Sequence, residues 1–428
     1  MRTVNLTEWE SSRPIPLSAG ELAELVGLRD ELKLTIEPAG GPDGGYILKP
    51  GSTVGALDLG GLSVAIHPKL PIGRVLHLAS WALGSPKTVA FRPESFGFKG
   101  EPTLVEALVP ALALAARRAF ARGLLHGYRT EEEALTTVRG RIRVDEQIRR
   151  RFGVPIPVEV RYDDFTDDLL PNRLVKAAAH RLSRLQLRSP RSRRDLGFIR
   201  ATLDNVKLVE FPPNAVPDVR FDRLNEYYRE VITLARLILR HTSIETGRGR
   251  VRANGFLMDM NVVFQEFVTR ALREELGLTE WTFPPDGKLP RRGIFLAKRH
   301  GKRPNRLDAV DTIALKPDLS WWEGPDRRTC TFVGDAKYKR VQNEQVPNAD
   351  IYQLLAYTTA LDLPGGLLIY AQGEAEDVIH HVRHAGKQLE IATLDLSGSI
   401  EDLKAGIGRL AERVRALRRS AIELRQAA

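Results

Sequence analysis

Two aspartates and a lysine in the last third of the chain have the types and the spacing needed to bind a metal ion. Asp318 follows a proline. The tripeptide of Asp335, Ala336 and Lys337 follows an apolar, β-branched run that is typical of a buried strand. Because side chains alternate along a strand, Asp335 and Lys337 are expected on the same face. The turn-forming residues 324–326 can reverse the chain and bring Asp318 beside Asp335.

Such a group suits the metal-assisted hydrolysis of a phosphodiester. Mg²⁺ prefers oxygen ligands in near-octahedral geometry, and two carboxylates can hold it while leaving positions for water and phosphate. A bound metal lowers the pKa of its water and stabilises the charge that develops on the phosphate. Lys337 can orient that water and add positive charge. The alternative is a solvated edge strand preceded by a turn-forming Pro-Asp pair, because short patterns recur by chance.

Two predicted helices flank the strands and can add side chains at the same point. Residues 260–272 carry apolar side chains at helical spacing, and Glu266 lies at the edge of that stripe. Glu266 can lean over the sheet as a further metal ligand, directly, through water or at a second metal. The second helix begins with Asp350 as its N-cap and places Gln353 and Tyr357 on one face. Either helix can instead serve only to cover the sheet.

The order of these parts resembles the core of the PD-(D/E)xK nucleases. In that family a helix acid precedes a PD strand, a (D/E)xK strand and a helix with a Q-x-x-x-Y pair. More specifically, the local sequence resembles McrC, the nuclease subunit of the McrBC modification-dependent restriction systems. Four segments between 255 and 370 carry this resemblance: MNVVFQEFV, LKPDL, GDAKYK and DIYQLLAY. Residues 45–71, which contain an I-x-P-K motif, and residues 138–148 and 162–182 extend it through the N-terminal half.

The resemblance implies a mixed α/β fold. Its C-terminal part would be a restriction-endonuclease-like domain, with a mixed sheet flanked by helices, after a β-rich and then helical N-terminal region. With the Pro-rich and Gly-rich connectors, it suggests three parts. These are a β-rich, partner-binding domain with a terminal helix (1–128), a mostly helical region (129–250) and the nuclease domain with a long C-terminal helix (251–428).

The resemblance also implies a type II-like, metal-dependent endodeoxyribonuclease. Members of this family cut DNA that contains methylcytosine when they are assembled with a hexameric AAA+ GTPase, McrB, whose GTP hydrolysis they stimulate. The N-terminal half would lie at the central pore of that partner. The chain would act in restriction, an antiviral defence, with Mg²⁺ as its cofactor and Mn²⁺ as an alternative metal.

Carried onto this chain, the resemblance gives each motif residue a role. The metal ligands would be Asp318, Asp335, the backbone carbonyl of Ala336, and Glu266. Lys337 would position the attacking water, and Gln353 would orient Lys337 or contact a phosphate. Tyr357 would support the same junction of helix and sheet.

Two other functions stay open on the sequence. A stand-alone nuclease of the same fold, acting in repair or defence, would cleave without a GTPase. A non-catalytic adaptor would use its basic surface to load DNA onto a motor, although the complete motif set argues against this. No GxxxxGK[ST] phosphate loop occurs in the chain, so any nucleotide-driven motor must be a partner.

Positive charge predicts a polyanion such as double-stranded DNA as a partner. The net charge is +10, and basic residues gather at 139–151, 181–200 and 291–306. The third cluster lies between the Glu266 helix and Asp318, so it is expected near the site, where arginines can grip phosphates. The alternative interpretation assigns many of these charges to solvated helix faces and loops.

Composition excludes several other kinds of protein. Cys330 is the single cysteine, so an internal disulfide and a multi-cysteine zinc site are excluded. No apolar stretch approaches the roughly 20 residues that cross a bilayer. The N-terminus lacks the apolar core of a signal peptide, so a cytoplasmic protein is expected. A heptad pattern over 400–424 predicts a long helix that packs on the chain's own core, or that joins a second subunit in a nuclease dimer or a tethered pair of complexes.

Overall fold

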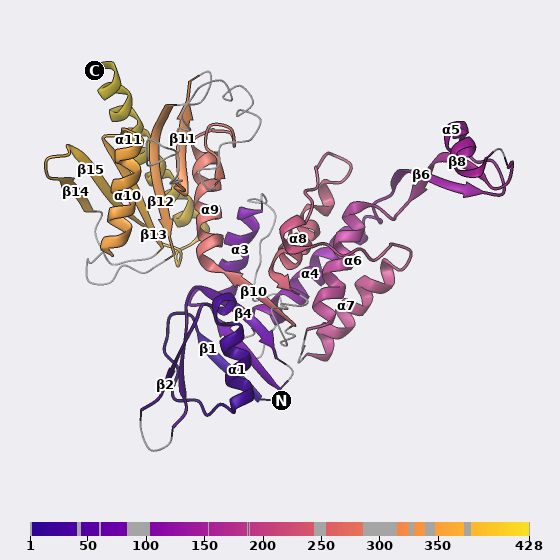
Figure 1. Ribbon diagram of the computed structural model, residues 1–428, viewed down its shortest axis with the longest axis horizontal. Helices are drawn as coiled ribbons and strands as arrows, with labels where there is room; N and C mark the ends of the chain where they lie inside the picture. Colours follow the sequence, from indigo (N-terminus) through magenta and orange to yellow (C-terminus); the bar gives the residue numbers. More distant parts are fainter. Residues whose placement is uncertain are drawn as a thin grey trace.

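The computed structural model of the chain has three parts, which Figure 1 shows: an N-terminal sheet, a helical bundle with a projecting arm, and a C-terminal sheet covered by helices. The structure describes residues 2–40, 44–59, 61–83, 103–152, 154–185, 187, 189–243, 254–285, 315–324, 329–338, 347–371 and 378–427. Within those ranges no helix is both long and apolar enough to cross a membrane.

The N-terminal part is built on a five-stranded sheet. Its strands lie in the order β1 (Arg2–Thr7), β5 (Leu62–His67), β4 (Thr53–Asp58), β10 (Asn254–Asp259) and β9 (Thr242–Ser243). β1 and β5 are parallel, and the other pairs are antiparallel. The other elements of this part are α1 (Ala19–Gly27), α2 (Arg29–Leu32), the antiparallel pair β2 (Leu34–Pro38) and β3 (Tyr46–Pro50), and α3 (Ile72–Ala82). Chain from both sides of residue 250 therefore shares one sheet, and the three-part division of the sequence stays a prediction.

A glycine lets two strands of this sheet approach closely. Gly55 in β4 has a φ of +133°, and a Cβ there would lie 2.0 Å from the carbonyl oxygen of Phe256 in β10. Any other residue would clash with backbone that cannot move aside. The glycine-rich N-terminal segment thus allows β4 to pair with β10, the strand that leads directly into α9 (Met260–Glu275).

A helical bundle follows the N-terminal strands, as the sequence predicts. It consists of α4 (Leu104–Phe120), α6 (Leu170–Ser183), α7 (Pro190–Thr202) and α8 (Arg229–His241), with 3₁₀ turns at Pro213–Ala215 and Glu226–Tyr228. α4 begins with a capping box between Thr103 and Glu106, and it continues through Pro110 as one helix. The apolar faces of these helices share one continuous core with α3 and α9.

An arm projects from the bundle between α4 and α6. Its antiparallel ribbon consists of β6 (Gly127–Leu135) and β8 (Val158–Thr166). Two short elements lie at the end of the ribbon: β7 (Arg141–Ile142) and α5 (Val144–Arg151). Figure 1 shows it extending away from both sheets. At the base of the arm, the Asp168 carboxylate accepts hydrogen bonds from Arg173 of α6 at 2.7 Å and from Arg129 of β6 at 2.5 Å. These contacts connect the arm to the bundle. The sequence predicts a mostly helical region here and does not predict the arm.

The C-terminal part is a mixed five-stranded sheet flanked by helices, which confirms the predicted fold class. The strand order is β11 (Leu319–Glu323), β12 (Thr329–Lys337), β13 (Gly365–Ala371), β15 (Lys387–Leu394) and β14 (Val378–Val382). The three central strands are parallel, and each edge strand is antiparallel to its neighbour. Both faces are covered, by α9, by α10 (Asn348–Ala360) and by α11 (Ile400–Ala427).

Successive side chains of β12 point to opposite faces of the sheet and therefore pack against different helices. Val333 lies on one face and belongs to a core with Leu354 of α10. Ala336 lies on the other face and belongs to a core with α9 and α11. Asp335 and Lys337 have the same parity as Val333, so they lie on the face that α10 covers.

The heptad pattern near the C-terminus belongs to α11, which packs on the chain's own sheet. The seam of this helix is buried at Leu403, Ile407, Leu410, Val414, Leu417 and Ala421. The first five of these side chains share a core with β13 and β15, and Ala421 belongs to the core that contains Leu354 of α10. The prediction of a long helix on the chain's own core is therefore confirmed. The same seam is not free to join a second subunit.

Candidate active site

Strands β11 and β12 bring Asp318 and Asp335 together. Asp318 directly precedes β11, which runs antiparallel to β12. The backbone N–H of Asp318 donates to Asp335 Oδ1 at 3.1 Å, and the N–H of Ala336 donates to Asp318 Oδ2 at 3.0 Å. The carboxylate of each aspartate thus accepts a backbone N–H at or next to the other aspartate. The predicted chain reversal occurs, although residues 325–328 lie outside the described part of the chain.

A chain of polar contacts runs from Asp335 to α10. Lys337 Nζ forms an ion pair with Asp335 and donates to Gln353 Oε1 at 3.1 Å. Gln353 Nε2 in turn donates to Tyr357 Oη at 2.7 Å. The predicted i, i+4 pair of α10 therefore does share one face. The lysine ammonium is fixed between a carboxylate and an amide.

The helix α10 begins before Asp350, which is not its N-cap. The helix starts at Asn348 with Pro347 as the N-cap, so Asp350 lies inside the first turn. There Asp350 is buried, and its Oδ2 accepts a hydrogen bond from the Tyr370 hydroxyl at 2.7 Å. Tyr370 is the neighbour of Lys337 across β12 and β13. Asp350 is therefore a second buried carboxylate close to the lysine, besides Asp335.

Burial and mutual repulsion disturb the charges of this group. Burial and the neighbouring Asp335 carboxylate raise the pKa of Asp318 to about 8. Asp335 is only 1% exposed, so water does little to screen the pair. Burial lowers the pKa of Lys337, but the attraction of Asp335 and Asp318 outweighs this effect and raises that pKa overall. The pair therefore favours a bound proton over two charged carboxylates, and the lysine beside it favours its charged form.

The residues present fit a hard divalent cation. Asp318 and Asp335 offer carboxylate oxygens and Ala336 a backbone carbonyl, and oxygen ligands are what Mg²⁺ prefers. A cation would replace the proton on Asp318 and offset the repulsion between the two carboxylates. Among the described residues, no group of three or more His, Cys, Asp or Glu side chains could hold a metal ion. The side-chain oxygens that the described residues bring together here are those of the two aspartates.

Helix α9 presents Gln265, rather than Glu266, to Asp318. Gln265 Nε2 donates to Asp318 Oδ1, and Thr269, one turn later, donates to the Asp318 carbonyl at 3.4 Å. Glu266 is exposed. Gln265 and Glu266 lie on opposite borders of the apolar stripe, and the stripe alone does not show which border faces the sheet. The i, i+4 spacing of Gln265 and Thr269 is the sequence signal that could have identified that border.

The basic clusters have different surroundings. Residues 139–151 lie at the end of the arm, where most of the arginines pair with carboxylates: Arg139, Arg143, Arg149, Arg150 and Arg151. In the cluster 181–200, Arg181 is buried and donates to backbone carbonyls of Leu239 and Thr242 at 2.9 Å. The cluster 291–306, predicted to lie near the site, falls outside the described residues. Most arginines of the first cluster and Arg181 of the second are thus engaged within the chain.

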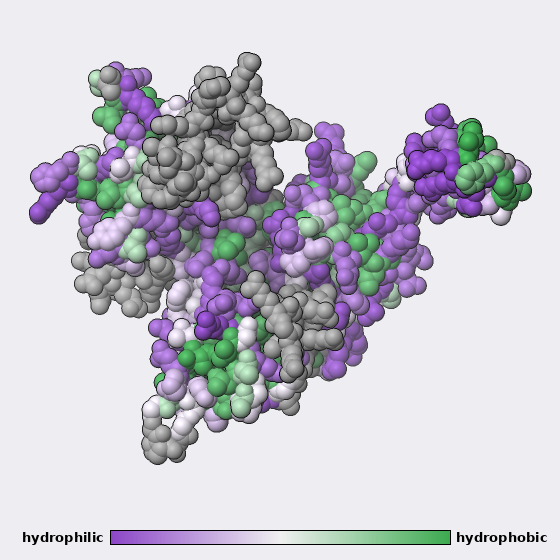
Figure 2. Space-filling view, in the orientation of Figure 1, coloured by the Kyte–Doolittle hydropathy of each residue, from purple (hydrophilic) through white to green (hydrophobic). Residues whose placement is uncertain are grey.

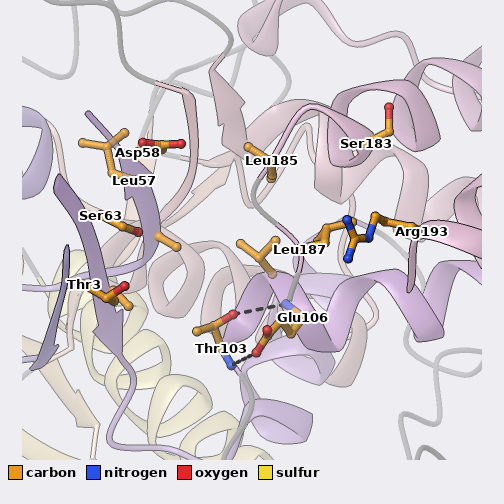
Figure 3. Close-up of a pocket in the computed structure, with 13 residues that line it drawn as sticks. Thr3, Leu57, Asp58, Ser63, Thr103, Glu106, Ser183, Leu185, Leu187 and Arg193 are labelled. Carbon is orange, nitrogen blue, oxygen red and sulfur yellow. Dashed lines mark hydrogen bonds between the residues drawn. The ribbon is translucent and has the colours of Figure 1, made fainter. Parts of the chain in front are cut away.

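A cavity of about 450 Å³ lies between the N-terminal sheet and the bundle. Figure 3 shows Thr3, Ser63 and Asp58 on its sheet side and Arg193 of α7 opposite. The two hydrogen bonds of the α4 capping box lie at its edge. None of the residues that line this cavity belongs to the group around Asp318. The cavity is therefore separate from the candidate active site.

The fold and the site together define a mixed α/β protein with a nuclease-like fold and two adjoining carboxylates at a sheet edge. Comparison with protein families gives a match over most of the chain. The model of the family described as McrBC 5-methylcytosine restriction system component matches residues 48–371, which is most of the chain. The chain belongs to this family.

One solved structure shows a similar fold. The structure of Thermococcus gammatolerans McrB AAA+ hexamers with bound McrC matches with a TM-score of 0.58 and 18% identity, over 96% of this chain and 100% of that chain. A second structure, of the McrBC complex from the same organism, matches with a TM-score of 0.42 and 21% identity, over 64% of this chain and 88% of that chain. No curated protein matches the chain.

Proposed function

We propose that the chain is the Mg²⁺-dependent DNA endonuclease subunit of an McrBC-type restriction complex. The observation that carries this proposal is the contact of Asp318 and Asp335 across β11 and β12, with Lys337 fixed beside them. Membership of the family supports the restriction context. A non-catalytic adaptor would have no use for two adjoining carboxylates, one of them buried, because keeping them together costs free energy.

The oxygen ligands would come from one edge of the sheet. Asp318, Asp335 and the backbone carbonyl of Ala336 would hold Mg²⁺, or Mn²⁺ in its place, and Glu266 would act through water or at a second metal. When bound, the metal supplies a water of lowered pKa and positive charge for the phosphate. The Ala336 N–H and the Gln265 amide bind the two oxygens of Asp318 and so fix the direction in which this carboxylate faces.

Lys337 would position the attacking water. Its ammonium is held by Asp335 and Gln353, and the Gln353 amide is held by Tyr357. The raised pKa of Lys337 keeps it charged at neutral pH, so it serves as a donor and a positive charge rather than as a general base. Burial and the charge of Asp335 raise the pKa of Tyr357 to about 12, so this hydroxyl also keeps its proton.

Double-stranded DNA would be held through its phosphates. The chain carries a net charge of +10, and arginines such as Arg191 and Arg194 are exposed on α7. Phosphate contacts position a duplex but do not read its sequence. The recognition of methylcytosine would therefore belong to the partner subunit.

The arm would make the contact with a hexameric AAA+ GTPase that is similar to McrB. In the related solved structure, McrC is bound to McrB AAA+ hexamers. Apolar side chains are exposed at the end of the arm, where Figure 2 shows them as a patch. They are between 54% and 91% exposed: Val144, Ile148, Phe152, Val154 and Ile156. Such a patch marks a binding surface, and a slender ribbon in the N-terminal half is suited to the pore of a ring.

Plasmid cleavage separates this proposal from a stand-alone nuclease. The purified chain would be incubated with Mg²⁺ and with methylated or unmethylated plasmid, in the presence or absence of the cognate AAA+ partner and GTP. We expect cleavage only when the partner, GTP and methylation are all present. Cleavage by the chain alone, indifferent to GTP, would show a stand-alone nuclease of repair or defence.

A further inference from the structure

One buried carboxylate outside the site joins the N-terminal sheet to the strand that carries Lys337. Glu8 directly follows β1 and is fully buried. Its Oε1 accepts a hydrogen bond from the backbone N–H of Lys69 at 2.7 Å and another from the Tyr338 hydroxyl at 2.9 Å. Lys69 lies just after β5 of the same sheet, whereas Tyr338 directly follows β12. Glu8 therefore bridges two parts of the chain that lie far apart in sequence.

Tyr338 connects this bridge to both sides of the carboxylate pair. It is the next residue after Lys337, so its position fixes the end of β12 from which the lysine side chain extends. Its ring centroid lies 6.1 Å from that of Phe264 in α9. Phe264 immediately precedes Gln265, whose amide donates to Asp318. The tyrosine thus packs between the strand that carries the lysine and the helix that holds the aspartate.

The I-x-P-K motif of residues 66–69 supplies the other end of the bridge. The Lys69 N–H binds the Glu8 carboxylate, and the Glu8 N–H donates to the His67 carbonyl at 3.0 Å. The Lys69 side chain forms a separate, exposed ion pair with Glu10 at 3.8 Å. Two backbone hydrogen bonds with the motif therefore hold Glu8 in one position at the edge of the N-terminal sheet.

Stability alone does not explain why a carboxylate makes this contact. Burial raises the pKa of Glu8 to about 7. Its second oxygen, Oε2, is buried and has no hydrogen-bond partner in the described part of the chain. Leaving this buried oxygen unpaired costs free energy. What the carboxylate adds is a directed contact that fixes the orientation of Tyr338.

We infer that Glu8 is a positioning residue, and this inference rests on the proposed nuclease function. Through its hydrogen bond with Tyr338, Glu8 connects the N-terminal sheet to the end of β12 and so holds Lys337 beside Asp318 and Asp335. Glu8 is not a catalytic residue, because it contacts Tyr338 and not the reacting atoms. The bridge gives the N-terminal half of the chain a direct mechanical connection to the site.

Three variants test the bridge in the complex assembled with the partner, GTP, Mg²⁺ and methylated DNA. Tyr338→Phe removes the hydroxyl, and Glu8→Ala removes the carboxylate. In both we expect kcat for cleavage to fall about tenfold or more, because a small misplacement of a catalytic group suffices for such a loss. KM for DNA and the rate of GTP hydrolysis should stay within about twofold. Glu8→Gln keeps an oxygen that accepts both hydrogen bonds, so kcat should return to within about threefold of wild type.

Tyr228→Phe is the matched control. Tyr228 is also buried, and its hydroxyl accepts the backbone N–H of Leu125 at 3.1 Å in the bundle. Its loss should lower the melting temperature about as much as Tyr338→Phe does and leave kcat unchanged. Should Glu8→Ala fail to fold, Tyr338→Phe, which loses a single oxygen atom, carries the test.

Three results would overturn the inference while the proposed function stands. They are wild-type kcat in Tyr338→Phe, a loss in Glu8→Gln as large as in Tyr338→Phe, or an equal loss in the Tyr228→Phe control. A wild-type complex that does not cut DNA at all would instead refute the proposed function, and with it the role of Glu8.

Discussion

At the residue scale, the site places two carboxyl groups and one ammonium group where water has little access. Asp318 and Asp335 each bind backbone beside the other, and Lys337 provides the ammonium that faces them. Burial and the second carboxylate raise the pKa of Asp318 to about 8. A proton and a metal ion would therefore compete for the carboxylate of Asp318. Two consequences of this competition can be measured.

The first consequence is that Mg²⁺ binding should release a proton. Because the pKa of Asp318 is about 8, the apparent Mg²⁺ affinity should fall about tenfold for each pH unit below that value. Titration calorimetry between about pH 6 and about pH 9 measures this dependence. Lys337→Ala is the control: lysine is not a metal ligand, so the affinity should stay within about tenfold although cleavage is lost. A pH-independent affinity, or no Mg²⁺ binding in Lys337→Ala, would refute these assignments.

The second consequence concerns the stability of the metal-free chain. The pKa of Asp318 is raised from 3.8 to about 8 on folding, so the folded state keeps a proton that the unfolded state releases. This contribution is present below about pH 4 and is lost as the pH rises through about 8. Thermal unfolding in EDTA should therefore show a melting temperature that decreases over this range, and Mg²⁺ should restore it. In Asp318→Asn the decrease of the melting temperature with pH should become smaller but not disappear, because the raised pKa of Glu8 also contributes to it. An unchanged decrease would contradict the role of Asp318.

At the element scale, the elements that bury an apolar face could be predicted from the sequence. The β-branched run before Asp335 indicates β12, and the alternation along it places Asp335 and Lys337 on one face, as the structure shows. The spacing of Gln353 and Tyr357 likewise indicates one face of α10. These features are local, so the sequence alone carries them.

Features that depend on tertiary packing could not be predicted in this way. The arm strand β6 contains three consecutive glutamates, and both faces of its ribbon meet water, so no apolar alternation marks it. The choice between Gln265 and Glu266 depends on how α9 is rotated about its axis, which packing against the sheet decides. The bridge from Glu8 to Tyr338 joins residues separated by almost the whole chain.

The end of the arm should be needed for the partner and not for folding. Phe152 is 91% exposed, so Phe152→Glu should change the free energy of unfolding by no more than about 0.5 kcal/mol. A central apolar side chain in an interface is worth about 2 kcal/mol or more, so binding to the AAA+ partner should weaken about thirtyfold. Titration of the stimulated GTP hydrolysis measures this loss. Leu224→Glu, at an apolar residue of the bundle that is 80% exposed, is the control, and an equal loss there would argue against the arm.

The base of the arm depends on Asp168. Its hydrogen bond with Arg173, together with Arg129, holds the pKa of this buried carboxyl well below its usual range. Asp168→Ala should lower the free energy of unfolding by about 3 kcal/mol and speed hydrogen exchange over residues 127–166. The stabilisation by Asp168 should be present above about pH 4 and be lost as the pH falls further. Asp164→Ala, which removes an exposed ion pair with Arg139, should cost less than about 1 kcal/mol; a similar cost in both variants would contradict the role of Asp168.

At the scale of the whole molecule, the N-terminal sheet and the site form one continuous structure. β10 of that sheet leads directly into α9, and Asp259 at the junction accepts the N–H of Asn261 at 3.0 Å and binds Lys33 at 2.6 Å. The contact of Glu8 with Tyr338 is a second connection. The half of the chain that we assign to the partner is thus joined to both the helix and the strand that position the carboxylates. This arrangement suits a nuclease whose activity depends on a partner.

The most direct measurement is DNA cleavage by the assembled complex carrying Asp335→Ala, beside GTP hydrolysis by the same sample. We predict that cleavage falls to background while partner binding and the stimulation of GTP hydrolysis stay at wild-type levels. Asp335→Asn, which keeps the size of the buried side chain, should behave in the same way and so exclude an effect of a cavity. Cleavage at the wild-type rate in Asp335→Ala would show that the active site of the complex lies elsewhere.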